Sequence, residues 1–515
     1  MKQTILVYIL VIFSVLLSNN SHAQVDPREA KEHFKNKNYL MAIPVYEKLI
    51  KKDPEDKDYL FNLAHCYLNT NIDKTLAIPH LEKLITLNRF DEEAYLMLGR
   101  AYMLNYEFDK AIEILEKYKK DAKRKHEESI AKMLEDCRTA KELIKFPHDI
   151  TFENLGEEIN SEYPDYQPFV SKDESILVFT TRRKENKGRM EFDGYYPSDV
   201  WYSEMKDGEF TKARQLKTVN SIYDEQVVGM TDDGQLLFIY LDHIKEYGNI
   251  YYSEYKKGKY YRTKKYDESV NSDDIETSAS ISGDGNTLFF ASNRKGGQGG
   301  LDLYMTRKLP TGDWAIPQNL GDKINTPYNE DFPTLSSDGK TLYFTSDGHP
   351  GMGGYDLYKS EWDPIENTWS EPTNLGYPLN TPDDDKTISF TEDGESAYIS
   401  ALRPKEGLGD LDIYRVIFND IANPPAMYAV TVALQGSEDE LIPDAFIMAY
   451  DENDEVVGEY SSNPTNSTYT IVLRPGKYTL EIETMDGKIH TENFYVTAFD
   501  AEKTLNDKKI IIPNQ

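Results

Sequence analysis

Cysteine is scarce in this sequence, with only Cys66 and Cys137 among 515 residues. Two cysteines are too few for a Cys/His metal cluster. A disulfide between them would need Cα atoms within about 7 Å of each other, and both lie in helical segments well separated along a repeated array. We therefore expect two buried free thiols.

Positive charge is also in short supply. The chain has 58 basic against 89 acidic side chains and a formal net charge of -31. Binding to nucleic acid needs clustered Lys and Arg that neutralise phosphates, and anionic lipid attracts basic segments for a similar reason. The composition therefore argues against both as partners.

Hydrolase motifs are missing as well. A triad hydrolase needs an activated Ser with a His partner, but the sequence has no G-x-S-x-G elbow. Four of its nine His residues fall in the helical segment described below, namely His33, His65, His80 and His126. Nothing reads as the separate α/β domain of prolyl-peptidase-type enzymes. We expect no catalysis of that class.

Long apolar runs are confined to the first residues. Thr4 to Leu17 form a run of about 14 apolar residues, which is short of the roughly 20 needed to span a bilayer. Lys2 precedes this run and Ser21-His22-Ala23 follows it, a pattern typical of a secretory signal. We expect residues 1–23 to be a signal peptide. The sequence has no Cys there for a lipid anchor and no later membrane span, so we expect a protein exported to the periplasm, where it could associate with the outer membrane.

Residues 27–145 have helical periodicity and repeat about every 34 residues. Small side chains at equivalent positions let paired helices approach closely, and large aromatic ones fill the space between neighbours. The recurring positions are Ala42, Ala77 and Ala111, then Ala64 and Gly99, then Tyr67 and Tyr102.

This pattern resembles the tetratricopeptide repeat, most closely in AYLMLGRAYMLNYEFDKAIEILEKY, residues 94–118. Three repeats are visible, and residues 129–145 are expected to form a capping helix. The first repeat departs from the pattern, with His33 where Tyr is expected. The resemblance implies an α-solenoid that binds proteins, although some such arrays act only as spacers.

From about residue 150 to 419 the periodicity changes to two. Segments such as SGDGNTLFFASN (282–293) and SSDGKTLYFTSD (336–347) recur at intervals of 51 to 60 residues. Each Asp-Gly indicates a tight hairpin turn, because Gly accepts positive φ there. The candidate positions are Asp233-Gly234, Asp284-Gly285, Asp338-Gly339 and Asp393-Gly394, with a weaker copy at Asp173.

A glycine-rich stretch, GGQGGLDLY (296–304), could be taken for a phosphate-binding loop. It recurs as HPGMGGYDLY (349–358) and more loosely as GLGDLDIY (407–414). A phosphate loop is single, ends in Gly-Lys-Ser/Thr and opens a helix. The stretch here recurs and opens a strand, so we expect a connection between two strands of a repeated sheet.

A closing phrase, as in NLGDKINT (319–326), follows four of the five units, and one copy, NLGEEINS (154–161), precedes the first. An early strand that completes the last sheet closes the ring of a β-propeller. Five blades are expected, or six if the long first unit hides another. The repeat resembles the WD40-like, TolB-type (PD40) propeller, a fold that hosts binding platforms and enzymes alike.

Residues 426–515 form a third unit of alternating strands, including TYTIVLRPGKYTLEIET (468–484). This segment resembles the carboxypeptidase regulatory-like β-sandwich, which is non-catalytic in that family. Its turn departs from the family's G-x-Y, with Asn466-Ser467-Thr468-Tyr469 in its place.

Acidic residues come before several inner strands of the repeated sheets. They are Asp165, Glu225, Glu276, Glu330-Asp331 and Asp383-Asp384-Asp385. Three roles stay open: capping of backbone amides, a Ca²⁺ site with oxygen ligands, and catalysis by paired carboxylates as in glycosidases. Recurrence at one place per unit favours the structural role, so no cofactor is expected.

The order of segments resembles that of type IX secretion-associated proteins of the OmpA family, without their OmpA-like domain. Peptidoglycan binding is therefore not supported. We expect a non-catalytic envelope scaffold that binds other envelope proteins. An enzyme of glycans or peptides acting at the propeller funnel is the alternative, and passive spacing is a third possibility.

Overall fold

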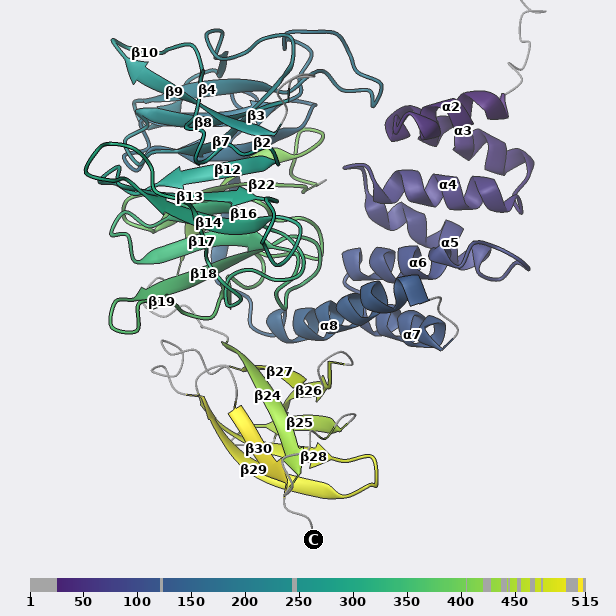
Figure 1. Cartoon of the computed structure of the whole chain (residues 1–515). Coiled ribbons are helices and arrows are strands. Elements are labelled where there is room, and N and C mark those ends of the chain that lie inside the picture. Colours follow the sequence, from purple (N-terminus) through teal and green to yellow (C-terminus); the bar gives the residue numbers. More distant parts are fainter. Residues whose placement is uncertain are drawn as a thin grey trace, which may run out of the picture.

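The structure is a computed structural model, and Figure 1 shows its three parts: a stack of helices, a pile of sheets beside it and a smaller β unit below. It describes most of the chain from residue 26, and the expected signal peptide lies outside the described residues. The described ranges are 26–120, 124–242, 248–403, 405–419, 428–436, 442, 445–451, 455–463, 468–473, 476–496 and 508–512.

Seven α-helices in the described N-terminal part form three hairpins and a final helix. They are α2 (Pro27–Lys35), α3 (Tyr39–Lys52), α4 (Lys57–Leu68), α5 (Ile78–Leu84), α6 (Glu93–Leu104), α7 (Phe108–Lys119) and α8 (Glu127–Leu143). Asp26 caps α2 by accepting a hydrogen bond from the N–H of Arg28, and Pro27 occupies the first turn, where no backbone N–H is needed. None of the described helices is both long enough and apolar enough to cross a bilayer.

The repeated small and aromatic positions lie where the helices pack. A Cβ on Gly99 would lie 2.8 Å from Cδ2 of Leu115, so glycine lets α6 and α7 approach. The hydroxyl of Tyr67 donates to Glu47 (2.8 Å) and that of Tyr102 donates to Glu82 (2.7 Å). Ala42, Ala64, Ala77 and Ala111 are fully buried.

Both cysteines are buried and unpaired, Cys66 on α4 and Cys137 on α8. Burial raises the pKa of the Cys66 thiol to about 12 and that of Cys137 still further. The thiols are therefore held neutral inside the helical core.

Residues 150–418 form five antiparallel sheets. The first sheet contains β2 (Asp165–Val170), β3 (Ile176–Thr181), β4 (Asp199–Lys206), β5 (Glu209–Phe210) and β6 (Arg214–Gln215). The second contains β7 (Asp224–Met230), β8 (Leu236–Asp242), β9 (Asn249–Lys256), β10 (Lys259–Tyr260) and β11 (Lys264–Lys265). The third contains β12 (Glu276–Ile281), β13 (Thr287–Ser292), β14 (Asp302–Arg307) and β15 (Gln318–Asn319).

The fourth sheet contains β16 (Glu330–Leu335), β17 (Thr341–Ser346), β18 (Asp356–Asp363), β19 (Thr368–Trp369) and β20 (Thr373–Asn374). The fifth contains β21 (Ile388–Phe390), β22 (Ser396–Ala401) and β23 (Asp412–Phe418), and its fourth strand is β1 (Ile150–Asn154). β1 pairs antiparallel with β23, from Ile150 opposite Phe418 to Asn154 opposite Tyr414. The start of this segment thus completes its last sheet.

Five buried clusters lie between neighbouring sheets and close the circle. Phe169 and Val227 share the cluster between the first and second sheets. Similar clusters join the second to the third, the third to the fourth and the fourth to the fifth sheet. Phe179 of the first sheet then packs with Tyr398 and Ile413 of the fifth. The arrangement is propeller-like and all-β.

The C-terminal part contains two sheets with a shared core. One has β27 (Thr468–Leu473), β24 (Tyr428–Gly436) and β30 (Lys508–Ile512); the other has β26 (Val456–Ser461), β25 (Phe446–Tyr450), β28 (Gly476–Glu483) and β29 (Ile489–Val496). Leu434 and Ile471 from the first sheet pack with Ile447, Leu480 and Ile482 from the second.

Candidate interaction surfaces

The Asp-Gly pairs occupy the hairpin turns between the first two strands of the second to fifth sheets. Asp233 accepts hydrogen bonds from the hydroxyl of Thr231 (2.7 Å) and the N–H of Gln235 (3.0 Å), and Gly234 has a φ of 66°. The same arrangement holds at Asp284-Gly285, Asp338-Gly339 and Asp393-Gly394. Each aspartate accepts hydrogen bonds from residues of its own turn, so these positions stabilise the turn conformation.

One carboxylate per sheet, placed at or just before the inner strand, accepts hydrogen bonds from a Ser or Thr four residues earlier. In the fourth sheet, Thr326 donates its backbone N–H (2.8 Å) and its hydroxyl (2.7 Å) to Glu330. Ser161–Asp165, Ser221–Glu225, Ser272–Glu276 and Thr381–Asp385 repeat this arrangement. Burial raises the pKa of Glu330 to about 7 and that of Glu225 to about 7.

The remaining candidate acids tie neighbouring segments together. Asp331 is buried and accepts hydrogen bonds from the hydroxyls of Thr277 (2.8 Å) and Ser278 (2.5 Å) of the third sheet. Asp384 is ion-paired with Lys386 at 3.1 Å, and Asp383 is ion-paired with Lys74 of the helical array. The described residues contain no group of three or more His, Cys, Asp or Glu side chains placed to hold a metal ion.

Sequence reasoning missed an asparagine that recurs in the closing phrase. Asn160 accepts a hydrogen bond from the N–H of Ile413 (2.8 Å) and donates one to its carbonyl (3.0 Å), as a neighbouring strand would. Asn220, Asn271, Asn325 and Asn380 clamp Val200, Ile250, Leu303 and Leu357 in the same way. The repeated Asn-Ser or Asn-Thr was the available signal.

The glycine-rich connections fold around the buried aspartate of the following strand. In the fourth sheet, Asp356 accepts hydrogen bonds from the N–H groups of Met352 (2.8 Å) and Gly353 (3.3 Å). A Cβ on Gly351 would lie 1.9 Å from Oδ2 of Asp356. Glycine is required because the carboxylate approaches the backbone so closely. The backbone N–H groups of this loop thus bind the carboxylate of Asp356, the first residue of β18.

The same connection of the fourth sheet docks on the helical array. Met352 is fully buried and belongs to the core of the helices. A Cβ on Gly353 would lie 2.9 Å from Cε of Met103 on α6. On α8, Lys132 is ion-paired with Asp136 and lies 3.4 Å from the carbonyl oxygen of His349. The two parts therefore form a continuous buried contact.

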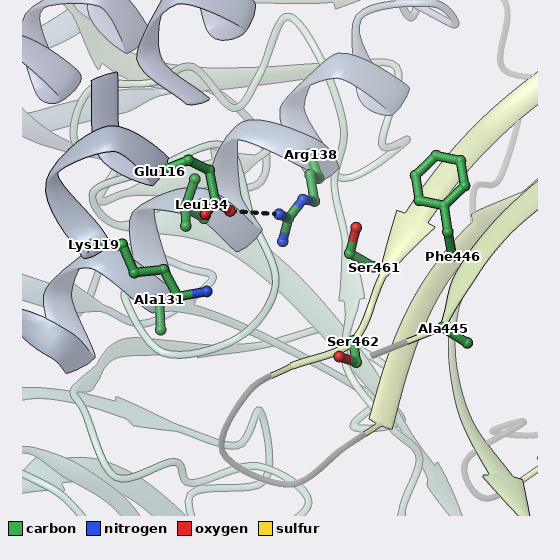
Figure 2. Close-up of a pocket in the computed structure, with 9 residues that line it drawn as sticks. All are labelled: Glu116, Lys119, Ala131, Leu134, Arg138, Ala445, Phe446, Ser461 and Ser462. Atoms are coloured by element: carbon green, nitrogen blue, oxygen red, sulfur yellow. Dashed lines mark hydrogen bonds and ion pairs between the residues drawn. The ribbon is translucent and has the colours of Figure 1, made fainter. Parts of the chain in front are cut away.

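Among the described residues, two clefts lie between the helical array and the β parts. One of about 250 Å³ runs between the array and the fifth sheet, and its lining includes Tyr106 and Arg403. The other, of about 300 Å³, lies between α7, α8 and the C-terminal sheets. Figure 2 shows the ion pair between Glu116 and Arg138 (3.3 Å) on one side of this second cleft and Ser461 on the other.

Comparison with known proteins gives a match to one family model over a short segment and a set of similar solved structures. A model of the tetratricopeptide repeat matches residues 28–72. No curated protein matches the chain.

Solved structures with similar folds include a TolB from Agrobacterium tumefaciens described as putative, with 11% identity, a TM-score of 0.31, and 70% of this chain and 92% of that chain covered. An α-L-arabinofuranosidase from Lactobacillus brevis has 10% identity and a TM-score of 0.33, covering 51% of this chain and 92% of that one. A Trypanosoma rangeli sialidase has 8% identity and a TM-score of 0.32, covering 64% and 73%. Likeness at this level carries no inference about activity.

Proposed function

We propose that this chain is a non-catalytic scaffold of the bacterial cell envelope that holds partner proteins on its helical array and on its ring of sheets. The observation that carries the proposal is that the recurring polar residues bond to the chain itself. The capping carboxylates bond to Ser or Thr, and the asparagines bond to strand backbones. What remains for recognition is the outer surface, as in repeat proteins that bind partners.

We also propose a family for each of the three parts. The helices are a tetratricopeptide array, the five sheets are the blades of a TolB-type propeller, and the C-terminal sheets are a carboxypeptidase regulatory-like sandwich. The protein is exported to the periplasm and works beside other envelope proteins, in an assembly related to type IX secretion or gliding. It needs no cofactor.

The turns at one end of the helical hairpins are already occupied by the sheets. Asn71, which follows α4, donates to Asp410 (2.6 Å), and Tyr106, which follows α6, packs edge-on against Tyr377 at 5.9 Å. This end of the array is therefore covered, and we expect partners on the helix faces. On the first helices of the hairpins, Lys31 and Arg100 are exposed.

A charge-reversal experiment on these faces tests the proposal. The variant Lys31→Glu with Arg100→Glu changes the first helices, and Lys48→Glu with Lys117→Glu makes the same change at exposed positions of the second helices. Cross-linking and affinity purification from the envelope fraction should recover a partner that the first variant loses and the second keeps. The proposal would be contradicted if the same proteins were captured with both variants and with a chain that lacks the array.

The alternative, an enzyme at the centre of the ring, finds no support in the carboxylates. Asp331 and Asp384 are both engaged with neighbouring side chains. We expect no turnover of a glycan or peptide panel by the chain. An activity abolished by Asp331→Asn and Asp384→Asn, with the fold intact by circular dichroism, would replace the scaffold proposal.

A further inference from the structure

The connection between β3 and β4 carries an exposed apolar tip. Residues 182–198 make this connection, which in the other sheets is shorter. Phe192 is 82% exposed and Met190 is 55% exposed. Exposing large apolar side chains to water costs free energy. Exposed apolar side chains that lie together mark an interaction site more often than exposed apolar side chains scattered singly over the surface.

The tip is held in place by Arg182 at its base. The guanidinium is ion-paired with Glu191 (2.6 Å) and with Asp193 (2.6 Å), the two residues on either side of Phe192. It also lies over the ring of Tyr195 at 5.0 Å. Both flanking carboxylates are thus drawn back toward the loop base, where they share one guanidinium, while Phe192 between them is left outside.

The tip is further tied to distant segments. The hydroxyl of Tyr195 donates to Asp410 (2.7 Å), and a Cβ on Gly194 would lie 3.0 Å from Oδ1 of Asn38 in the turn before α3. The loop is therefore a built projection between the first sheet and the first helical hairpin. A preorganised loop loses little conformational entropy on binding.

The charge around the tip is opposite to that of the whole chain. Lys184 and Arg189 are exposed on the loop, and Glu185 is its one exposed carboxylate without an ion-pair partner among the described residues. The Nζ of Lys187 donates to the backbone carbonyls of Lys217 (3.3 Å) and Asn220 and is in no ion pair with a described residue. In the adjoining turn Lys37 is exposed as well. This excess of positive charge stands out in a chain with a net charge of -31.

We infer that this tip is a docking element for a partner protein that offers an apolar pocket for Phe192 within an acidic surface. The inference rests on the scaffold function proposed above and names the chemistry of one partner. A buried aromatic anchor ringed by polar contacts is how interfaces concentrate their affinity, and complementary charge sets orientation and association rate. A lipid surface fits less well, because even a single myristoyl chain gives only marginal binding and the two side chains bury less hydrocarbon.

Site-specific photocross-linking in living cells tests the inference. The photoreactive p-benzoylphenylalanine replaces Phe192 in the full-length chain, and the control carries it at Ile365, which is 88% exposed on the fourth sheet. We expect a cross-linked protein from position 192 and not from 365. The attached partner peptide, identified by mass spectrometry, should contain more acidic than basic residues.

Charge reversal then separates specific docking from chance contact. Lys184→Glu with Arg189→Glu should reduce the cross-link at least tenfold, whereas Lys295→Glu with Lys340→Glu, at exposed positions elsewhere, should leave it unchanged. No product, a product with phospholipid or a second copy of this chain, or a yield unaffected by reversal would overturn the inference. If one of these outcomes occurs while capture of a partner still depends on Lys31 and Arg100, the scaffold function is retained and only the docking role of the tip is refuted.

Discussion

Asn160 clamps Ile413 although 253 positions separate them: its amide accepts from the backbone N–H and donates to the backbone carbonyl of the same residue. This contact fastens the start of the ring to its end. Four other asparagines make the same clamp within single sheets, where no closure is involved. The Asn160–Ile413 clamp therefore stabilises the closure of the ring, whereas the other four clamps stabilise individual sheets.

Replacing Asn160 by Ala should destabilise the ring and loosen β1. The buried N–H of Ile413 would lose its partner, which costs about 1–3 kcal/mol, whereas the carbonyl keeps its hydrogen bond from the N–H of Leu155 (3.2 Å). Asn325→Ala removes the same bonds from Leu303 inside the third sheet and is the matched control. Hydrogen exchange should show faster exchange of residues 150–154 in the first variant only. Equal protection of β1 in both would mean that the clamp does not close the ring.

The glycine at position 351 should resist replacement. Gly351→Ala places a Cβ against the buried Asp356 carboxylate, and we expect a loss of roughly 2–4 kcal/mol, as for other overpacked core sites. Gly283→Ala, whose nearest neighbour would be the Ser337 oxygen at 3.9 Å, should change stability by less than about 0.5 kcal/mol. Thermal unfolding measures both. A similar melting temperature for the two variants would refute the close approach.

Two glutamates at equivalent positions should respond oppositely to amide replacement. Glu276 is ion-paired with Arg294 at 3.0 Å, so Glu276→Gln should destabilise at neutral pH by leaving a mostly buried cation unpaired. No cation is ion-paired with Glu330 among the described residues, and burial raises its pKa to about 7. Glu330→Gln should therefore be neutral or stabilising above pH 7, by about 1–3 kcal/mol at most.

The pH dependence of this effect has a definite sign. The folded state keeps the Glu330 proton where the unfolded chain has lost it, so this group's contribution to stability is complete below about pH 4.5 and is lost as pH rises to about 7. Denaturant unfolding at pH 4.5 to 8 should show a smaller loss in Glu330→Gln than in the unaltered chain. Parallel curves would show that Glu330 does not titrate in this range.

Thiol reagents should reach neither cysteine in the folded protein. Only the thiolate reacts, and burial raises the pKa of Cys66 to about 12. We expect negligible labelling at pH 8 and two labelled thiols per chain in denaturant, without any reductant. A single reactive thiol in the native state, or none after unfolding, would contradict the buried, unpaired state of the pair.

The elements with a short repeat in the sequence could be foreseen from it. The helical spacing of Ala64 and Gly99 marks where helices pack, and the Asp-Gly turns mark the hairpins, because backbone geometry at a turn depends on a few adjacent residues. The glycine stretches were likewise placed between strands by their recurrence. Local chemistry suffices for such features.

Contacts between parts could not be foreseen in the same way. Met352 reads as one more residue of a glycine loop, yet it is buried in the core of the helices. Lys132 reads as a solvated helical residue, yet it is ion-paired beside that loop. Such contacts depend on how two parts of the chain pack against each other, and the repeat pattern of each part carries no information about that packing.

The sequence by itself determined the order of helices and strands, the turns and the closing strand, because each follows from the steric and hydrogen-bonding needs of neighbouring residues. Only the tertiary structure decided which surfaces remain for partners. It placed the recurring carboxylates on backbone amides and left Phe192 outside between two acids that share one guanidinium. Burial and charge pairing are properties of the folded assembly, since they depend on residues that are distant in sequence.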